Sequence, residues 1–347
     1  MEYAIYTDAY DMEKQQIRIS FILPFYGVER YIGKCLESIY TQDIPEEQYE
    51  VICVNDCSPD HSEDVVLEYA QKHANLTLIR HEVNKKLGAA RNTGLRAAKG
   101  RYVWFIDTDD YIQENCLAHV LELCEKNDLE ILHFNIQDNF GNNIRRLVPT
   151  GVITGPEEEL ISEKQQCIEI TFPWNRVYKK EFLIENGLWF NNLYGGDVIH
   201  TILAINVCQR IMNVDEFFHF YRVDNMSSDT KSAATAQKVY DMSYVLAQAI
   251  HEIVPQIKPQ WKPEIAECVP WRINTSIRGV MRLPKDEQMK LMSMLKNNPS
   301  LYEFILQHGD YQTRLILGNI YMLRLASFVY VNLRNIKRRI SSNSINT

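Results

Sequence analysis

The chain has 347 residues, of which 46% are hydrophobic and 24% are charged, so its composition is that of a globular protein with room for two domains. The formal net charge of −8 argues against a general nucleic-acid-binding role, because such binding needs a basic face.

Apolar segments with the pattern of β-strands alternate with segments of helical period in the first part of the chain. The predicted strands are residues 17–26, 49–56, 76–82, 101–110 and 129–136. The predicted helices are residues 29–40, 62–73, 88–98 and 114–126. Nearly continuous apolar strands between helices are typical of a parallel sheet that is covered on both faces. We therefore predict an α/β fold of the Rossmann-like type, with a mostly parallel sheet and helices on both faces.

The pattern changes beyond about residue 140, where the strand–helix alternation ends. From about residue 232 onward it is helical, with polar turns at prolines. Residues 311–340 are apolar but interrupted by polar side chains and end in basic ones, which is too polar for a transmembrane helix. Two interpretations of this tail remain open: a helix that lies on an anionic membrane, and a helix that packs into the protein core.

The cysteines and the N-terminal residues indicate the cellular compartment of the protein. None of the eight cysteines forms a C-x-x-C pair or a zinc-type cluster, and in apolar runs a reduced thiol behaves as a small hydrophobe. Residues 1–16 lack the apolar core of a signal peptide. We therefore expect a cytoplasmic protein with reduced thiols.

Acidic residues gather where the predicted strands end. Asp56 ends the second strand, and Asp107, Asp109 and Asp110 end the fourth. In open α/β sheets ligands bind outside the carboxyl ends of the strands. Asp107 and Asp109, two positions apart, can converge on a hard divalent cation such as Mn²⁺ or Mg²⁺. The alternative is that these acids are solvated or cap a helix.

Four motifs occur in a fixed order around these acids. They are Pro24 with Tyr26, Val54-Asn55-Asp56-Cys57-Ser58-Pro59-Asp60, Ala90-Arg91-Asn92-Thr93-Gly94, and Asp107-Thr108-Asp109-Asp110. Together they resemble the family 2 glycosyltransferases of bacterial surface-polysaccharide synthesis, which have the GT-A fold.

The resemblance implies roles for the residues of these motifs. Pro24, Tyr26, Glu29 and Asp56 would line the pocket for the base and ribose of a nucleotide-sugar. Arg91 would lie near the donor, and Asp107 and Asp109 would hold sugar hydroxyls, ribose and the metal. The alternatives are a surface ion pair for Arg91, and helix packing or a turn for Asn92 and Gly94.

A second block of resemblance lies downstream. Trp174-Asn175-Arg176-Val177-Tyr178-Lys179-Lys180-Glu181-Phe182 is similar to a W-N-K-x-Y-x-x-x-F stretch of bacterial members. Trp174 and Asn175 are therefore candidate acceptor contacts. The relatives' later Glu-Asp pair corresponds to Gly196 and Asp197, which makes Asp197 the candidate catalytic base. Its alternative role is the N-cap of the helix that follows.

Further positions match the family or depart from it. Arg222, in a segment that includes Ser227 and Ser228, would contact the diphosphate through its forked donors, and the alternative is a structural salt bridge. Gly196 replaces a Glu, while Cys57 and Lys86 replace glycines. Side chains at these two positions would narrow or reshape the donor pocket.

We predict three regions: an N-terminal extension (1–16), a nucleotide-sugar-binding and catalytic domain (17–230), and a helical C-terminal region with a basic amphipathic tail (231–347). The expected activity is inverting transfer of a hexosyl or N-acetylhexosaminyl group, most simply from a UDP-sugar, to a saccharide or lipid-linked acceptor. A lipid-linked acceptor would make contact of residues 311–340 with the inner face of the membrane useful. The alternatives are a non-catalytic nucleotide-sugar-binding protein and a metal-dependent nucleotidyltransferase.

Overall fold

The computed structural model describes residues 17–145, 149–158, 172–225, 235–253, 277, 280, 283–308, 313, 314 and 317. The chain separates into two compact units, Met1–Asn192 with Gly196–Ser228, and Leu193–Gly195 with Asp229–Thr347. The predicted extension 1–16 and nearly all of the tail 311–340 lie outside the described residues. The functional division into domains stays a prediction.

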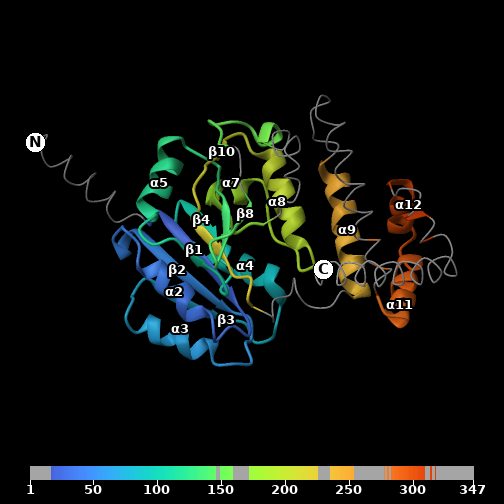
Figure 1. Cartoon of the computed structure of the whole chain (residues 1–347), viewed down its shortest axis with the longest axis horizontal. Helices are drawn as coiled ribbons and strands as arrows, with labels where there is room; N and C mark the ends of the chain where they lie inside the picture. The colour runs from blue at the N-terminus through green and yellow to red at the C-terminus, as the bar shows by residue number, and fades with distance from the viewer. Residues whose placement is uncertain are drawn as a thin grey trace, which may run out of the picture. The chain divides into compact units, whose positions relative to one another are not determined.

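A seven-stranded sheet organises the first unit (Figure 1). Its strand order is β10-β6-β9-β4-β1-β2-β3. The strands are β1 (Ile19–Phe25), β2 (Tyr49–Asn55), β3 (Leu76–Arg80), β4 (Tyr102–Phe105), β6 (Ile131–His133), β9 (Arg176–Lys179) and β10 (Ile211–Asn213). β4, β1, β2 and β3 are mutually parallel, β10 is parallel to β6, and β9 is antiparallel to both of its neighbours. The predicted, mostly parallel α/β fold is confirmed.

Alternation along the strands divides the core into two layers. In β1, Ile19, Phe21 and Leu23 pack into one layer and Ile22 into the other. The first layer is covered by α2 (Ile32–Tyr40), α3 (Ser62–Ala70) and α5 (Leu117–Lys126). The second is covered by α4 (Lys86–Ala97), α7 (Lys180–Glu185) and α8 (Gly196–Val207). Figure 1 shows these groups on opposite sides of the sheet.

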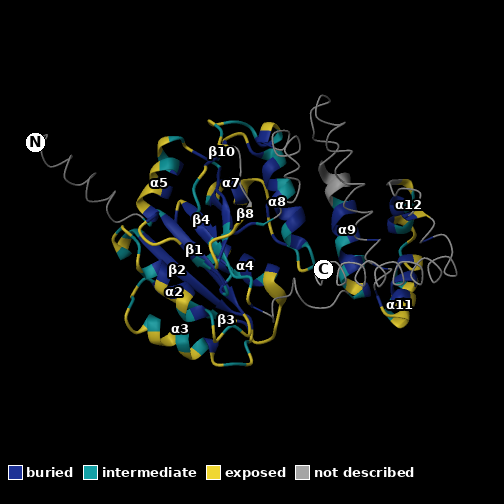
Figure 2. Cartoon of the chain, in the orientation of Figure 1, coloured by how far each residue is buried: buried dark blue, intermediate teal, exposed yellow. Residues whose placement is uncertain are grey.

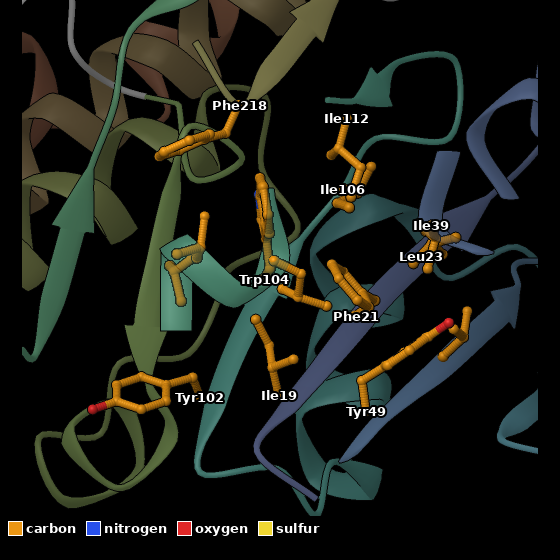
Figure 3. Close-up of a cluster of buried hydrophobic side chains, with 14 of the residues drawn as sticks. Ile19, Phe21, Leu23, Ile39, Tyr49, Tyr102, Trp104, Ile106, Ile112 and Phe218 are labelled. Atoms are coloured by element: carbon orange, nitrogen blue, oxygen red, sulfur yellow. The ribbon is translucent and has the colours of Figure 1, made fainter. Parts of the chain in front are cut away.

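Large aromatic side chains fill the first layer. Phe21 and Trp104 lie at its centre with ring centroids 5.8 Å apart, and Tyr49 meets Phe21 edge-on (Figure 3). The strands β1, β2 and β4 are buried along their length, while the helices expose their outer sides (Figure 2). This packing holds the strand ends, and the acids that follow them, in place.

A second, four-stranded sheet lies beyond the end of β4. Its order is β5-β11-β7-β8, with β5 (Tyr111–Ile112), β11 (His219–Tyr221), β7 (Ile136–Asp138) and β8 (Asn143–Arg145). The predicted continuous strand 129–136 is therefore wrong in one respect, because it divides into β6 and β7, which belong to different sheets. The small sheet brings residues 219–225 next to residues 109–112.

The second unit is helical in its described residues. It contains α9 (Ala236–Ile253), α11 (Lys285–Lys296) and α12 (Pro299–His308). The Asn298 side chain donates to Tyr240 Oη at 2.9 Å, and the Ala236 backbone N–H donates to Glu287. No helix in the described part of the chain has the length and apolarity needed to cross a membrane.

Candidate functional site

Arg91, Asp107 and Asp197 form a single ion-pair cluster. Arg91 projects from α4, Asp107 follows β4, and Asp197 lies in the first turn of α8. Arg91 Nη2 donates to Asp107 Oδ1 at 2.5 Å, and Nη1 donates to Asp197 Oδ1. The Arg91 side chain is fully buried, whereas those of Asp107 and Asp197 are 26% and 31% exposed. Arg91 is thus in an ion pair, but a buried one, and it joins the predicted base to the D-x-D motif.

Burial and the neighbouring charges act in opposite directions on the pKa values of Arg91 and Asp197. Burial opposes the charge of Arg91, but Asp107 and Asp197 outweigh it and raise the Arg91 pKa. Burial also raises the pKa of Asp197, while Arg91 pulls it back down. Arg91 therefore keeps its positive charge. It also limits the rise in the pKa of Asp197, whose carboxylate solvent can still reach.

Asp109 and Asp110 are fixed by the segment that contains β11. The Asn225 side chain donates to Asp109 Oδ2 at 2.8 Å, and Arg222 Nε donates to the Asp109 carbonyl at 2.7 Å. Asp110 is buried and bonded to His219 Nε2 at 2.9 Å and to the Arg222 backbone N–H at 2.7 Å. The sequence motifs do not mark Asp110 or Asn225 as site residues, and they give no role to His219.

Buried charge changes the protonation of this group. Burial, followed by the charges of Asp110 and Asp107, raises the pKa of Asp109 to about 6. Burial lowers the pKa of His219 to about 4, so this histidine is neutral near pH 7. Burial also raises the pKa of Asp110 well above the usual range of an aspartate.

Asp107 and Asp109 supply only part of the ligand set that a divalent cation needs. No group of three or more His, Cys, Asp or Glu among the described residues is arranged to hold a metal ion. Asp107 and Asp109 nevertheless supply hard oxygen ligands, and their mutual repulsion is a charge that a cation would relieve. A site with only two carboxylates needs further oxygens from a bound ligand, which a diphosphate can provide.

The predicted nucleotide-pocket residues lie in loops that are tied together. Asp56 Oδ1 is bonded to His81 Nδ1 at 2.7 Å and accepts from the Lys85 backbone N–H at 2.8 Å. Glu29 accepts through Oε2 from the His61 backbone N–H at 3.0 Å. These bonds join the loops after β1, β2 and β3.

Tyr26 and Pro24 occupy different environments in that region. Tyr26 is 51% exposed, so its ring is accessible to a nucleobase. Pro24 is buried in β1, and its carbonyl accepts from Thr108 Oγ1 at 3.0 Å. Pro24 therefore fixes the D-x-D turn to the end of β1.

Cys57 and Lys86 both adopt the left-handed backbone conformation, with φ of 61° and 70°. This conformation favours glycine, because a Cβ there is crowded. Both side chains are exposed. Cys57 directly follows Asp56, and Lys86 follows Lys85, whose backbone N–H donates to Asp56. The departures from the family's glycines thus fall on positions where the backbone itself prefers glycine.

The two candidate acceptor contacts are packed inside the protein. Trp174 is 3% exposed and stacks on His219 and Tyr221, with centroid distances of 4.4 Å and 5.5 Å. Asn175 is fully buried and donates to the Phe134 carbonyl at 3.2 Å. The predicted contact with an acceptor therefore has little exposed side-chain surface through which to act.

Arg222 lies beside Asp109 but is heavily engaged. Its guanidinium packs over the rings of Tyr31 and Tyr111, 5.1 Å and 5.7 Å from their centroids, and Nη1 is 3.7 Å from Asp224. The diphosphate contact and the structural salt bridge both remain open. Ser227 and Ser228 lie outside the described residues.

The helices that carry Arg91 and Asp197 contribute three further residues: Asn92 and Gly94 from α4, and His200 from α8. Asn92 bonds both backbone polar groups of Phe190, at 2.7 Å and 2.9 Å. A Cβ at Gly94 would overlap Ile22 of β1, so glycine allows α4 to lie close against the sheet. Burial, followed by the charge of Arg91, lowers the pKa of His200 to about 3.

Known proteins are similar to this chain in sequence. The family model described as Glycosyl transferase family 2 matches residues 20–187. The uncharacterized glycosyltransferase EpsJ of Bacillus subtilis is 31% identical over 221 residues, which cover 61% of this chain and 63% of EpsJ. TarS of Staphylococcus aureus, a poly(ribitol-phosphate) beta-N-acetylglucosaminyltransferase, is 28% identical over 67% of this chain and 40% of its own length. The match thus spans less than two thirds of either relative.

Solved structures have the same fold. The crystal structure of residues 1–349 of S. aureus TarS in complex with UDP-GlcNAc aligns with a TM-score of 0.70 and 20% identity, over 93% of this chain and 92% of that one. The mannosyltransferase PcManGT of Pyrobaculum calidifontis, in complex with GDP-Man and Mn²⁺, aligns with a TM-score of 0.54 and 18% identity, over 90% and 86%. Residues 20–187 of this chain thus match the model of glycosyltransferase family 2, and the chain has the GT-A fold of the TarS structure.

Proposed function

We propose that this chain transfers a sugar from a UDP-sugar to a hydroxyl of a saccharide or lipid-linked acceptor, with inversion at the anomeric carbon. The match of residues 20–187 to the family 2 model supports sugar transfer, and the complex of TarS with UDP-GlcNAc supports a UDP-sugar as donor. We further propose that the protein acts in the cytoplasm. Contact of residues 311–340 with the membrane stays a prediction.

The observation that carries the proposal is the bridge from Asp107 through Arg91 to Asp197. Inverting transfer needs a base beside the donor's anomeric carbon and a separate group at its phosphates. The bridge fixes the candidate base, Asp197, beside the motif expected to hold the donor. Residue 197 lies about a hundred positions after residues 91 and 107, so the convergence of the three side chains supports a built site.

Asp197 can take the proton of the attacking hydroxyl. A carboxylate within hydrogen-bond reach suffices as a general base, even when its pKa lies well below neutrality. As the acceptor oxygen bonds to the anomeric carbon, its proton passes to Asp197 and the bond to the diphosphate oxygen breaks. Arg91 holds Asp197 in one orientation through Oδ1.

Asp107 and Asp109 are the residues that would hold the divalent cation. When bound, such a cation neutralises the charge that develops on the departing diphosphate. Asn225 and Arg222 fix the Asp109 side chain and backbone, so this ligand is oriented in advance.

The replacement Asp197→Asn tests the proposal. It keeps the size of the side chain but removes its basicity, so we expect the kcat for UDP release from a UDP-sugar to fall by about 100-fold or more. The affinity for UDP with Mn²⁺ should change by less than about 2-fold, because Asp197 acts on the acceptor side.

Asp64→Asn is the matched control, since Asp64 is a 70% exposed carboxylate on α3. It should leave both quantities unchanged. Full turnover by Asp197→Asn would remove Asp197 from its role. Release of pyrophosphate instead of UDP would identify a nucleotidyltransferase. Nucleotide binding without turnover of any UDP-sugar would identify a non-catalytic binding protein.

A further inference from the structure

The segment around Asn191 packs between the first turns of α4 and α8. A Cβ at Gly88, in α4, would overlap the Asn191 carbonyl oxygen. A Cβ at Gly196, in α8, would overlap Asn191 Oδ1 and lie 2.7 Å from its carbonyl oxygen. Both helices therefore have a glycine at the position where Asn191 touches them, and a larger residue would push the segment away.

Side chains of the same two helices fix this segment. Asn92 of α4 bonds the backbone N–H and carbonyl of Phe190. The Phe190 ring stacks on His200 of α8 at 3.7 Å between centroids, with 9° between the ring planes. On α4 the Arg91 guanidinium lies 5.2 Å from the centroid of the same ring. The position of Asn191 is thus determined by neighbours on both sides.

This position adjoins the candidate base. Asp197 follows Gly196 directly, and Arg91 lies one helical turn after Gly88. Asn191 is partly exposed, as is Asp197, whereas Gly196 is buried beneath them. A polar amide oxygen therefore lies at the helix end from which Asp197 projects, in the place where a side chain of residue 196 would otherwise be.

We propose that Asn191 is an acceptor-binding residue that recognises a hydroxyl next to the one that Asp197 deprotonates. The proposal rests on the proposed function and narrows its acceptor class to compounds with adjacent hydroxyls, such as polyols and sugars. An amide both donates and accepts hydrogen bonds, so it suits a hydroxyl in either orientation. A neutral group here also leaves Asp197 as the base without a second carboxylate at residue 196.

Simple alcohols can test this recognition directly. Turnover of a UDP-sugar in the presence of glycerol or 1-propanol divides between hydrolysis and transfer to the alcohol. Glycerol has a hydroxyl adjacent to the reacting one, and a second terminal hydroxyl, that 1-propanol lacks. Counted per terminal hydroxyl, we expect the wild-type chain to transfer to glycerol about 3- to 10-fold more than to 1-propanol, the value of one hydrogen bond. Asn191→Ala should abolish that preference while hydrolysis in buffer stays within about 2-fold.

Asn192→Ala is the matched control, because Asn192 is the exposed neighbour in the same segment. It should keep the preference for glycerol. A second comparison uses Gly196→Ala, whose Cβ would overlap the Asn191 amide. It should lower transfer, and the double variant Asn191→Ala with Gly196→Ala should recover part of the loss, since the overlap with Oδ1 is gone.

The outcomes separate the two proposals. If the wild-type chain turns over no UDP-sugar, the proposed function fails. If it turns over the donor but shows no preference for glycerol, or if Asn191→Ala keeps that preference, the role of Asn191 is overturned. Unchanged nucleotide affinity with Mn²⁺ in Asn191→Ala would verify that the variant is folded around its donor site.

Discussion

Asp109 is the residue whose charge depends most on the fold in the candidate metal site. Its pKa is raised to about 6 from an ordinary value of 3.8 by burial and by two neighbouring carboxylates. Between these values the folded chain binds more protons than the unfolded chain, so the free energy of unfolding falls as the pH rises. Below about pH 4 the group has no effect on stability, and above about pH 6 its destabilising effect is complete.

We therefore expect Asp109→Asn, without metal or nucleotide, to raise the Tm at pH 7.5 by about 2 to 4 °C. At pH 4.5 the Tm values should differ by less than about 1 °C, because wild-type Asp109 is then protonated. Mn²⁺ with UDP should reverse the order at pH 7.5, since only the wild type retains the anionic ligand. Thermal unfolding at the two pH values measures this, and a lower Tm for the variant at pH 7.5 would contradict it.

Cys57 and Lys86 carry a cost in backbone conformation that glycine would remove. We expect Cys57→Gly and Lys86→Gly each to raise the free energy of unfolding by about 0.5 kcal/mol, because a left-handed cost of about 1 kcal/mol is partly offset by the freer unfolded chain. The alanine variants at both positions should give no gain. Urea unfolding measures the difference, and equal stabilisation by alanine and glycine would show that conformation is not the cause.

At this scale the sequence identified single residues better than their partners. Arg91, Asp107 and Asp197 could each be named from the motifs, but their ion pairs could not, because Arg91 and Asp197 are separated by 106 positions. Asp110 was quoted within its motif without a role. Its partner His219 lies 109 positions away, and nothing local to either residue marks the pair.

Among the elements, α4 and the segment after α7 are joined by the hydrogen bonds of one side chain, that of Asn92. Asn92 satisfies two backbone groups of Phe190 in a buried environment. We expect Asn92→Ala to lower the free energy of unfolding by about 2 to 4 kcal/mol, because both groups lose their partner where water cannot replace it.

Asn186→Ala provides the comparison for this prediction. Asn186 also bonds a backbone carbonyl, that of Phe182, but it is exposed and directly follows α7. Its loss should cost less than about 1 kcal/mol. Equal destabilisation of the two variants in urea unfolding would mean that Asn92 does not fix the segment.

Elements with long apolar runs were predicted well, and short ones were not. β1 and β2 are seven-residue strands buried along their whole length, so their pattern is clear in the sequence. β9 has four residues and pairs with β4 and β6, whose sequences lie far upstream. Its antiparallel insertion depends on tertiary packing, which no local pattern reports. The split of residues 129–136 has the same origin.

Across the whole molecule, every residue of the candidate site lies in the first unit. We therefore expect UDP with Mn²⁺ to slow amide hydrogen exchange in residues 54–60, 84–94, 105–112 and 219–225. Exchange in α11 and α12 of the second unit should change little. Hydrogen–deuterium exchange with mass spectrometry measures both, and protection confined to α11 and α12 would place the nucleotide elsewhere.

β9 also has a consequence for how the protein is made. In the large sheet it alone joins the pair β10 and β6 to the four strands β4, β1, β2 and β3. On the ribosome, a nascent chain that stops before Arg176 contains β6 and the four strands β4, β1, β2 and β3, but neither β9 nor β10. It can form the four-stranded group but cannot join β6 to it. The edge of β4 would then stay unpaired for about seventy residues of synthesis, from Phe105 to Arg176, and that of β6 for about forty, from His133. Unpaired strand edges of this kind invite pairing with other chains.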